Sequence, residues 1–125
     1  MDSVMHFEIP VDDAKRAQKF YSTVFGWKIN EMPEMNYTMV QTTETGEDRM
    51  PKEAGRINGG MMKRSKDVKA PVITINVEDI DKALAKIEKN CGKVVGKKME
   101  IPNMGWSAYF KDPEDNVIGL FQGKM

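Results

Sequence analysis

The stretch HFEIPVDDAKRAQKFYSTVFGWKI at residues 6–29 returns, 66 positions later and without a gap, as VITINVEDIDKALAKIEKNCGKVV at residues 72–95. The identical pairs are Ile9 and Ile75, Val11 and Val77, Asp13 and Asp79, Ala17 and Ala83, and Gly26 and Gly92. An internal repeat of this kind predicts two copies of one structural unit. His6, the only histidine, falls on Val72, so the copies differ at a position that can carry chemistry.

Each copy of the repeat begins with an alternating pattern. Phe7, Ile9 and Val11 are apolar, whereas His6 and Glu8, which alternate with them, are polar. The second copy keeps the same phase of apolar positions over residues 72–77. Because side chains alternate between the two faces of a strand, each copy is predicted to open with a strand that packs one face and leaves the other free.

A helix is predicted after each of these strands. Apolar residues recur there at helical spacing, at Ala14, Ala17, Phe20, Tyr21 and Val24 in the first copy and at Ile80, Ala83, Leu84 and Ile87 in the second. Asp12 and Glu78 are expected near the helix starts, where a carboxylate stabilises the free backbone N–H groups. Gly26 and Gly92 are expected to end the helices in the left-handed conformation.

Three shorter strands are predicted after each helix, at Trp27–Met32, Tyr37–Thr42, Ile57–Lys63, Val94–Ile101, Trp106–Lys111 and Val117–Gln122. This order predicts an α+β protein of two tandem βαβββ modules whose sheets form a rolled mixed-sheet cleft. We expect a single domain over residues 1–125, with module one at 1–63, a linker at 64–69 and module two at 70–125. The polar segment 43–56, which contains Gly and Pro, is predicted to be a mobile surface loop.

The later strands extend the repeat with shifted offsets. The stretch MNYT aligns with MGWS, which pairs Tyr37 with Trp106, and GMM aligns with GLF, which pairs Gly60 with Gly119. Gly59 beside Gly60 in a strand indicates a bulge, or a place that another backbone or a ligand approaches closely. Two glycines at corresponding positions are therefore expected to hollow out the middle of the sheet.

The composition is that of a small globular protein with little net charge. The chain has 125 residues, 40% of them hydrophobic, and its 19 basic residues balance 19 acidic ones. This balance predicts neither a nucleic-acid nor an anionic-membrane partner, and no apolar run approaches the roughly 20 residues of a membrane-spanning helix. The N-terminal segment MDSVMHFEIP lacks the features of a signal peptide, and one cysteine, Cys91, fits a reducing compartment. We expect a cytoplasmic protein in which Cys91 is a half-buried small residue at a helix end.

The segments HFEIPVDD, FY, VFGW and YFKDPEDNVIGLFQ resemble motifs of the glyoxalase, bleomycin-resistance and extradiol-dioxygenase superfamily, also called vicinal-oxygen-chelate proteins. The resemblance covers nearly the whole chain and implies the glyoxalase/bleomycin-resistance fold. It implies no single activity, because the superfamily hosts lyases, epimerases, oxygenases, transferases and metal-free drug-binding proteins on one architecture.

The resemblance also implies where a metal would be held. In metal-dependent members the ligands lie on the first and last strands of each module, at positions that correspond here to His6, Gly60, Val72 and Gly119. Only His6 has a donor atom, whereas a stable zinc, nickel or iron site needs three or four protein ligands. The glutamate that serves metal-dependent glyoxalases as ligand and base is missing too. We therefore expect no metal, no cofactor and no glyoxalase I activity, and other kinds of enzyme remain open.

The residues expected to line the cleft are His6, Glu8, Tyr37, Gly60, Met62, Val72, Thr74, Trp106, Gly119 and Phe121. His6 and Glu8 share a strand face and are candidates for a polar pair that orients a ligand or moves a proton, and the alternative is a structural histidine at a sheet edge or dimer interface. Tyr37 and Trp106 would suit a flat ligand, a core or a dimer interface equally. Several of the eleven methionines lie on these strands and could accept varied apolar ligands or fill gaps in the core.

The leading interpretation is a metal-free member of the superfamily that forms a homodimer and binds a small, partly apolar molecule in the cleft, as bleomycin-resistance proteins do. One alternative is a lactoylglutathione lyase-like or dioxygenase-like enzyme that uses an unrecognised metal site, or His6 with Glu8 as an acid–base pair. A second alternative is an accessory or interaction protein with a vestigial cleft, whose partner binds the outer surface or the 43–56 loop.

Overall fold

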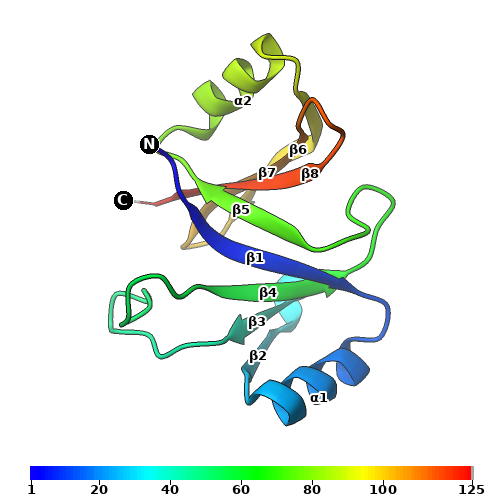
Figure 1. The fold of residues 1–125 in the computed structure, drawn as a ribbon, viewed down its shortest axis with the longest axis vertical. Helices are drawn as coiled ribbons and strands as arrows, with labels where there is room; N and C mark the ends of the chain where they lie inside the picture. Colours follow the sequence, from blue (N-terminus) through cyan, green and yellow to red (C-terminus); the bar gives the residue numbers. More distant parts are fainter. Residues whose placement is uncertain (125) are drawn as a thin grey trace. The chain divides into compact units, whose positions relative to one another are not determined.

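The computed structural model describes residues 1–124 and divides the chain into two compact units. The N-terminal unit is His6–Pro71, and the C-terminal unit is the chain from Val72 onward together with Met1–Met5. Over the described residues, the strands and the two α-helices follow one another in the order that the repeat predicts (Figure 1). The α+β class and the two βαβββ units are therefore confirmed, and their grouping into one domain stays a prediction.

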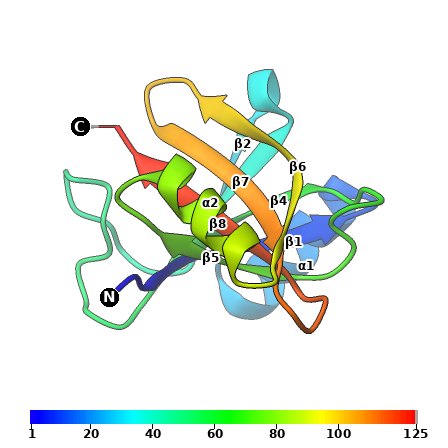
Figure 2. The same cartoon turned by 90° about the horizontal axis from the view of Figure 1, so that it is seen from above.

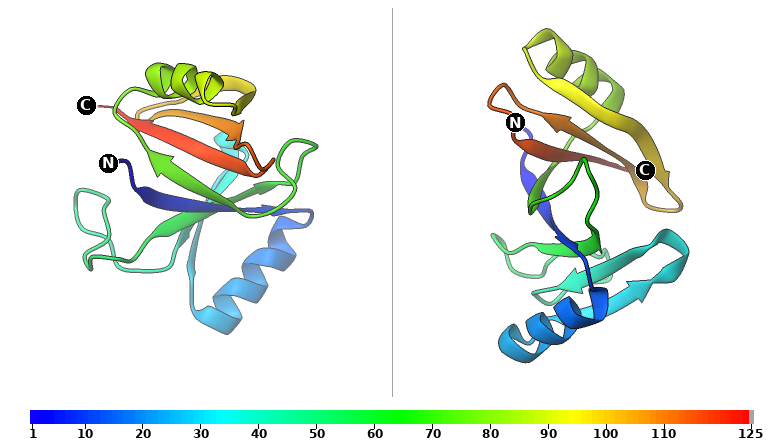
Figure 3. Two further views of the ribbon diagram at one scale, coloured as in Figure 1. Left: turned by 45° about the horizontal axis from the view of Figure 1, so that its top comes forward. Right: turned by 90° about the vertical axis from the view of Figure 1, so that its right-hand side faces the viewer.

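The N-terminal unit contains β1 (Val4–Val11) from His6 onward, α1 (Ala14–Phe25), β2 (Lys28–Met32), a 3₁₀ turn η1 (Pro33–Met35), β3 (Tyr37–Gln41) and β4 (Asn58–Lys63). Its strands are hydrogen-bonded in the order β2-β3-β4-β1, with β1 parallel to β4 and the other neighbours antiparallel. The helix α1 lies against one face of this sheet (Figure 3). On that face a buried core of Val11, Val40 and Met61 is packed against Phe7, Ile9, Ala17, Tyr21, Trp27 and Ile29.

The C-terminal unit consists of β5 (Val72–Asn76), α2 (Ile80–Lys89), β6 (Lys93–Ile101), β7 (Gly105–Lys111) and β8 (Val117–Gly123). Its strand order, β5-β8-β7-β6, repeats the first pattern, with β5 parallel to β8. The helix α2 packs on β6, β7 and β8 (Figure 2). Its buried core is Val77, Ile80, Ala108, Phe110 and Leu120.

Both helices begin with an aspartate N-cap, one residue later than the predicted carboxylates. Asp13 and Asp79 accept hydrogen bonds of 3.0 and 3.1 Å from the backbone N–H three residues further on. Asp12, which the sequence placed at the helix start, instead forms an exposed ion pair with Arg64 at 3.1 Å. The helix start is thus set by the identical residue of the repeat, because its side chain satisfies an otherwise free donor.

The helix ends agree with the prediction in one copy only. Gly26 is the left-handed C-cap of α1, with φ 73°. In the C-terminal copy the helix ends at Lys89, and the left-handed residue is Cys91 at φ 71°, not Gly92. Cys91 is exposed, so the expected half-burial is wrong. A Cβ on Gly92 would approach Cγ2 of Ile87 to 2.5 Å, so glycine is needed there for close packing.

The strand register confirms one pairing of the repeat. Glu8 of β1 is paired with Gly60 of β4, and Thr74 of β5 is paired with Gly119 of β8. Since Glu8 and Thr74 are related by the 66-residue shift, Gly60 and Gly119 occupy equivalent positions, as predicted.

The pairing of Tyr37 with Trp106 is wrong by one residue. Tyr37 is paired with Met62, and Phe121, the equivalent of Met62, is paired with Ser107. A one-residue slip moves a side chain to the opposite face of a sheet. Trp106 accordingly packs against the core beside α2, on the sheet face opposite to that of Gly119 and Phe121.

Candidate functional site

The predicted cleft residues of the N-terminal unit come together on the sheet face opposite α1. The alternation of β1 and the register of β3 and β4 place on this face His6, Glu8, Tyr37, Met39, Gly60 and Met62. These side chains are partly buried, and Gly60 is buried. The face therefore combines a few polar groups with flexible apolar methionines.

His6 and Tyr37 form the polar centre of this face. Nε2 of His6 and the hydroxyl of Tyr37 are hydrogen-bonded at 2.8 Å, and the two rings lie nearly parallel, with centroids 6.5 Å apart and planes inclined by 20°. Burial lowers the pKa of His6 from 6.5 to about 4, because the charged imidazolium loses its water. At neutral pH His6 is therefore uncharged, so it offers a directional hydrogen bond without a buried positive charge.

Gly60 provides the space in which Tyr37 lies. A Cβ on Gly60 would overlap the end of the Tyr37 phenol ring, and one on Gly59 would overlap the backbone and ring of Phe7. The pairing of β4 with β1 continues through both glycines without a shift, so the predicted bulge is absent from this stretch of the described chain. The group that approaches the glycine closely is Tyr37, and the hollow expected at Gly60 is filled by it.

The C-terminal unit has a different lining on its corresponding face. Val72 and Thr74 are buried there, and Oγ1 of Thr74 would lie 2.9 Å from a Cβ on Gly119. Phe121 lies on the same side as Gly119, two positions along β8. Trp106, which was predicted with these residues, instead lies on the helix side, and its ring centroid is 5.6 Å from Nζ of Lys124.

The four positions implied as metal ligands do not fit a metal. Gly60, Val72 and Gly119 have no donor atom, and Nε2 of His6 is hydrogen-bonded to Tyr37. Among residues 1–124, no group of three or more His, Cys, Asp or Glu side chains could hold a metal ion. The donor set thus disagrees with the metal site that the resemblance implies for other members.

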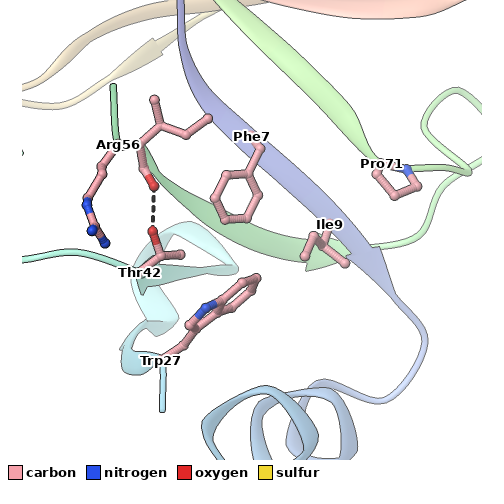
Figure 4. Close-up of a pocket in the computed structure, with 7 residues that line it drawn as sticks. Phe7, Ile9, Trp27, Thr42, Arg56 and Pro71 are labelled. Carbon is pink, nitrogen blue, oxygen red and sulfur yellow. Dashed lines mark hydrogen bonds between the residues drawn. The ribbon is translucent and has the colours of Figure 1, made fainter. Parts of the chain in front are cut away.

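An open groove on the opposite face of the same sheet was not predicted. Its volume is about 460 Å³, and its lining is Phe7, Ile9, Trp27, Thr42, Arg56, Ile57 and Pro71 (Figure 4). Phe7 and Ile9 alternate along β1 with His6 and Glu8, so they point to the other side of the sheet. One sequence feature could have indicated this groove: Trp27 corresponds to Lys93 in the second copy of the repeat, so a large aromatic residue is present in one copy only.

Comparisons with known proteins agree with this fold. The family model described as bleomycin resistance protein-like N-terminal matches residues 3–43. A glyoxylase-like domain-containing protein from Didymella fabae is 29% identical over 118 residues, which are 90% of this chain and 88% of that protein.

Solved structures share the fold at low sequence identity. A hypothetical protein from Bacillus halodurans C-125 matches with a TM-score of 0.65 at 12% identity, over 99% of this chain and 96% of that one. Methylmalonyl-CoA epimerase of Streptomyces coelicolor, in complex with 2-nitronate-propionyl-CoA, matches with a TM-score of 0.66 at 12% identity, over 98% of this chain and 97% of that one. The methylmalonyl-CoA epimerase of Mycobacterium tuberculosis matches with a TM-score of 0.60 at 14% identity, over 98% of this chain and 88% of that one. Within residues 1–124, no helix has the length and apolar character needed to cross a membrane.

Proposed function

We propose that the chain is a metal-free member of the glyoxalase and bleomycin-resistance superfamily and that it binds a small, partly apolar molecule. The proposed site is the sheet face of the N-terminal unit that carries His6, Glu8, Tyr37 and Met62. The observation that carries the proposal is the hydrogen bond between Tyr37 and a neutral His6 on a face that also carries methionines. Small-molecule sites typically combine an apolar lining with a few placed polar groups.

The pKa of His6 favours binding over catalysis. A general base works best when its pKa lies near the working pH. With a pKa of about 4, His6 is a weak base at neutral pH, and it can still accept or donate a hydrogen bond. The proposed role of His6 and Tyr37 is therefore to orient a polar group of the ligand.

Two further parts of the proposal concern the C-terminal unit and the assembly. Val72, Thr74, Gly119 and Phe121 lie on the corresponding face of their own unit and are proposed as a second, less polar binding surface. We also propose a cytoplasmic homodimer. These parts follow from the repeat and the composition.

The similar proteins suggest which molecules to test first. Structures of methylmalonyl-CoA epimerase contain methylmalonyl-CoA or 2-nitronate-propionyl-CoA, which combine an acyl chain with polar groups. Bleomycin is the second probe, because the matching family model describes bleomycin resistance protein-like domains.

The test is isothermal titration of each probe, and of a fragment library, into the wild type and into Tyr37→Phe. Loss of the hydroxyl removes one hydrogen bond of the site, so affinity should fall about fivefold. Tyr21→Phe is the matched control, because Tyr21 lies on the helix side of the same unit. Equal affinities of Tyr37→Phe and the wild type, or the absence of any bound compound, would refute the proposal.

A proton-transfer enzyme is the second candidate function. The 2.8 Å hydrogen bond between His6 and Tyr37 favours it, because it joins two groups able to exchange a proton. This candidate predicts that the protein speeds the exchange of the α-proton of methylmalonyl-CoA with deuterated water, and that His6→Val loses this activity. Exchange at the rate of a protein-free control would eliminate it for this probe.

A further inference from the structure

The groove on the helix side of the N-terminal unit is bounded by an aromatic cluster. The indole of Trp27 is stacked on Tyr21, with centroids 4.7 Å apart and planes inclined by 8°. The ring centroids of Phe7 and Phe25 lie 5.6 and 5.9 Å from that of the indole. Stacking on Tyr21 holds the indole in place, so the groove has a wall that needs no rearrangement to receive a flat ring.

The fold does not require these aromatic residues. The C-terminal unit has the same strand, capped helix and following strand, yet the repeat substitutes Ile73 for Phe7, Ile87 for Tyr21, Cys91 for Phe25 and Lys93 for Trp27. A βαβββ unit therefore forms without an aromatic residue at any of the four positions. The cluster is a feature of the N-terminal copy alone, where Phe7, Tyr21 and Trp27 pack against the core, and Phe7 and Trp27 also border the groove.

Of the polar groups that line the groove, only the guanidinium of Arg56 is charged and accessible to a ligand. Thr42 donates its hydroxyl to the carbonyl of Ile57 at 2.6 Å, and its backbone N–H to Oδ1 of Asn58 at 2.7 Å. Arg56 forms an ion pair with Glu53, and the side chains are 59% and 67% exposed. An exposed pair of this kind contributes little, so a ligand carboxylate can replace the glutamate. Arg56 is thus the cation of an otherwise apolar groove.

We propose that this groove is a further binding site, which takes a flat aromatic monocarboxylate. The ring lies against Trp27 and Phe7, and the carboxylate accepts hydrogen bonds from the guanidinium of Arg56. A volume of about 460 Å³ is within the range of small-molecule sites and accommodates one or two fused rings. Phe7 and Ile9 point from β1 into the groove, Trp27 faces them, and Arg56 and Pro71 lie at opposite ends (Figure 4).

This site is separate from the proposed function of the His6 face. The side chains of β1 alternate between the two sites, since Phe7 and Ile9 point to the side of the sheet opposite His6 and Glu8. A ligand in the groove should therefore leave the signals of His6 unchanged. This independence lets either proposal fail without the other.

The experiment follows the indole N–H signals of the two tryptophans by nitrogen-15 NMR during titration with 2-naphthoate. The Trp27 signal should move and saturate, while Trp106, in the other unit, is the internal control. The neutral 2-naphthamide, of the same shape, should bind about fivefold more weakly, because it lacks the charge that Arg56 recognises. A Trp27 signal that stays fixed at millimolar 2-naphthoate would overturn the proposal.

Two variants test the parts of the site. Arg56→Gln should bind acid and amide equally, and Arg49→Gln, which changes another exposed arginine of the same loop, should keep the preference for the acid. Trp27→Leu should lose about tenfold in affinity for both compounds. If Trp27→Leu fails to fold, the comparison of acid and amide in Arg56→Gln still decides, and an unchanged preference there would refute the role of Arg56. A Trp27 signal that shifts with protein concentration and resists 2-naphthoate would show a second copy in the groove and overturn the proposal.

Discussion

The two copies of the repeat use their helices differently. In α2, Ile80 is only 1% exposed, whereas Ala14, at the same position of α1, is exposed. No residue of α1, all of which lies in the described part of the chain, is fully buried, and Phe20, Val24 and Phe25 are 54%, 55% and 60% exposed. The C-terminal copy uses its helix to close a core. The N-terminal copy leaves apolar surface uncovered, which a stable fold alone does not need.

The first strands of the two units, β1 and β5, also differ in polarity. His6 and Glu8 of β1 become Val72 and Thr74 in β5, and the residue packed on the equivalent glycine changes from Tyr37 to Thr74. One copy has therefore kept simple packing, and the other carries a polar pair on one sheet face and an aromatic groove on the other. This difference confines the polar site at His6 and the aromatic groove to the N-terminal unit, and the surface proposed on the C-terminal unit is the less polar one.

The largest effect is expected when the first residues of the two helices, Ala14 and Ile80, are exchanged between the copies. Ile80→Ala should lower the free energy of unfolding by about 3 kcal/mol, because it opens a cavity in the α2 core. The reciprocal Ala14→Ile should change it by less than about 0.5 kcal/mol, because that position is exposed. Urea unfolding followed by circular dichroism measures both. Similar losses in the two variants would show that the helices are packed alike.

The next effect is a pH dependence that only the N-terminal copy should have. The pKa of His6 is about 4 when folded and 6.5 otherwise, so between these values the unfolded chain binds more protons. Stability is therefore complete above pH 6.5 and falls as the pH drops, by about 2 kcal/mol between pH 7 and pH 5. His6→Val, which copies the second repeat, should lack this part of the decrease. Parallel stability curves for the two proteins over that interval would contradict the burial of His6.

The equivalent glycines should respond unequally to a methyl group. Gly60→Ala displaces Tyr37 and breaks its hydrogen bond to His6, which should cost about 1–2 kcal/mol in unfolding free energy. Gly119→Ala would place its Cβ 2.9 Å from one atom, Oγ1 of Thr74, so it requires a smaller displacement than Gly60→Ala and should cost about half as much. In Gly60→Ala, the carbon-bound proton signals of His6 should also titrate closer to pH 6.5. An unchanged His6 titration would mean that Tyr37 does not depend on Gly60 for its place.

The smallest expected difference is at the helix caps, where the copies are alike. Asp13→Ala and Asp79→Ala each remove one hydrogen bond to a backbone N–H and should each cost about 1 kcal/mol. Urea unfolding of the two variants should therefore give nearly equal losses. A loss confined to one of them would place its helix start elsewhere.

The sequence predicted the elements and the strand faces because both depend on local periodicity. The 66-residue repeat brought Glu8 and Thr74 into equivalent places, and the register confirms the matching glycines. Trp106 was assigned to the wrong face because MGWS resembles MNYT in composition, and a shift of one residue in that alignment reverses the side of the strand.

Features that depend on packing between elements could not be predicted in this way. The space at Gly60 is filled by Tyr37, which joins β3 to β4. The left-handed residue after α2 is Cys91, while Gly92 lies too close to Ile87 for a side chain. The aromatic groove was missed for the same reason. Its residues come from separate strands and loops, and apolar positions on a helix-side face look like core in a sequence.

The central claim, that the sheet face of the N-terminal unit binds a small molecule, is tested most directly through its methionines. Carbon-13 methyl spectra would be recorded during titration with methylmalonyl-CoA and with bleomycin. The account predicts that the methyl signals of Met39 and Met62 move together with at least one probe, while that of Met99, which is 55% exposed in the other unit, stays in place. Signals of Met39 and Met62 that remain fixed while a probe binds, or while neither probe binds, would contradict it.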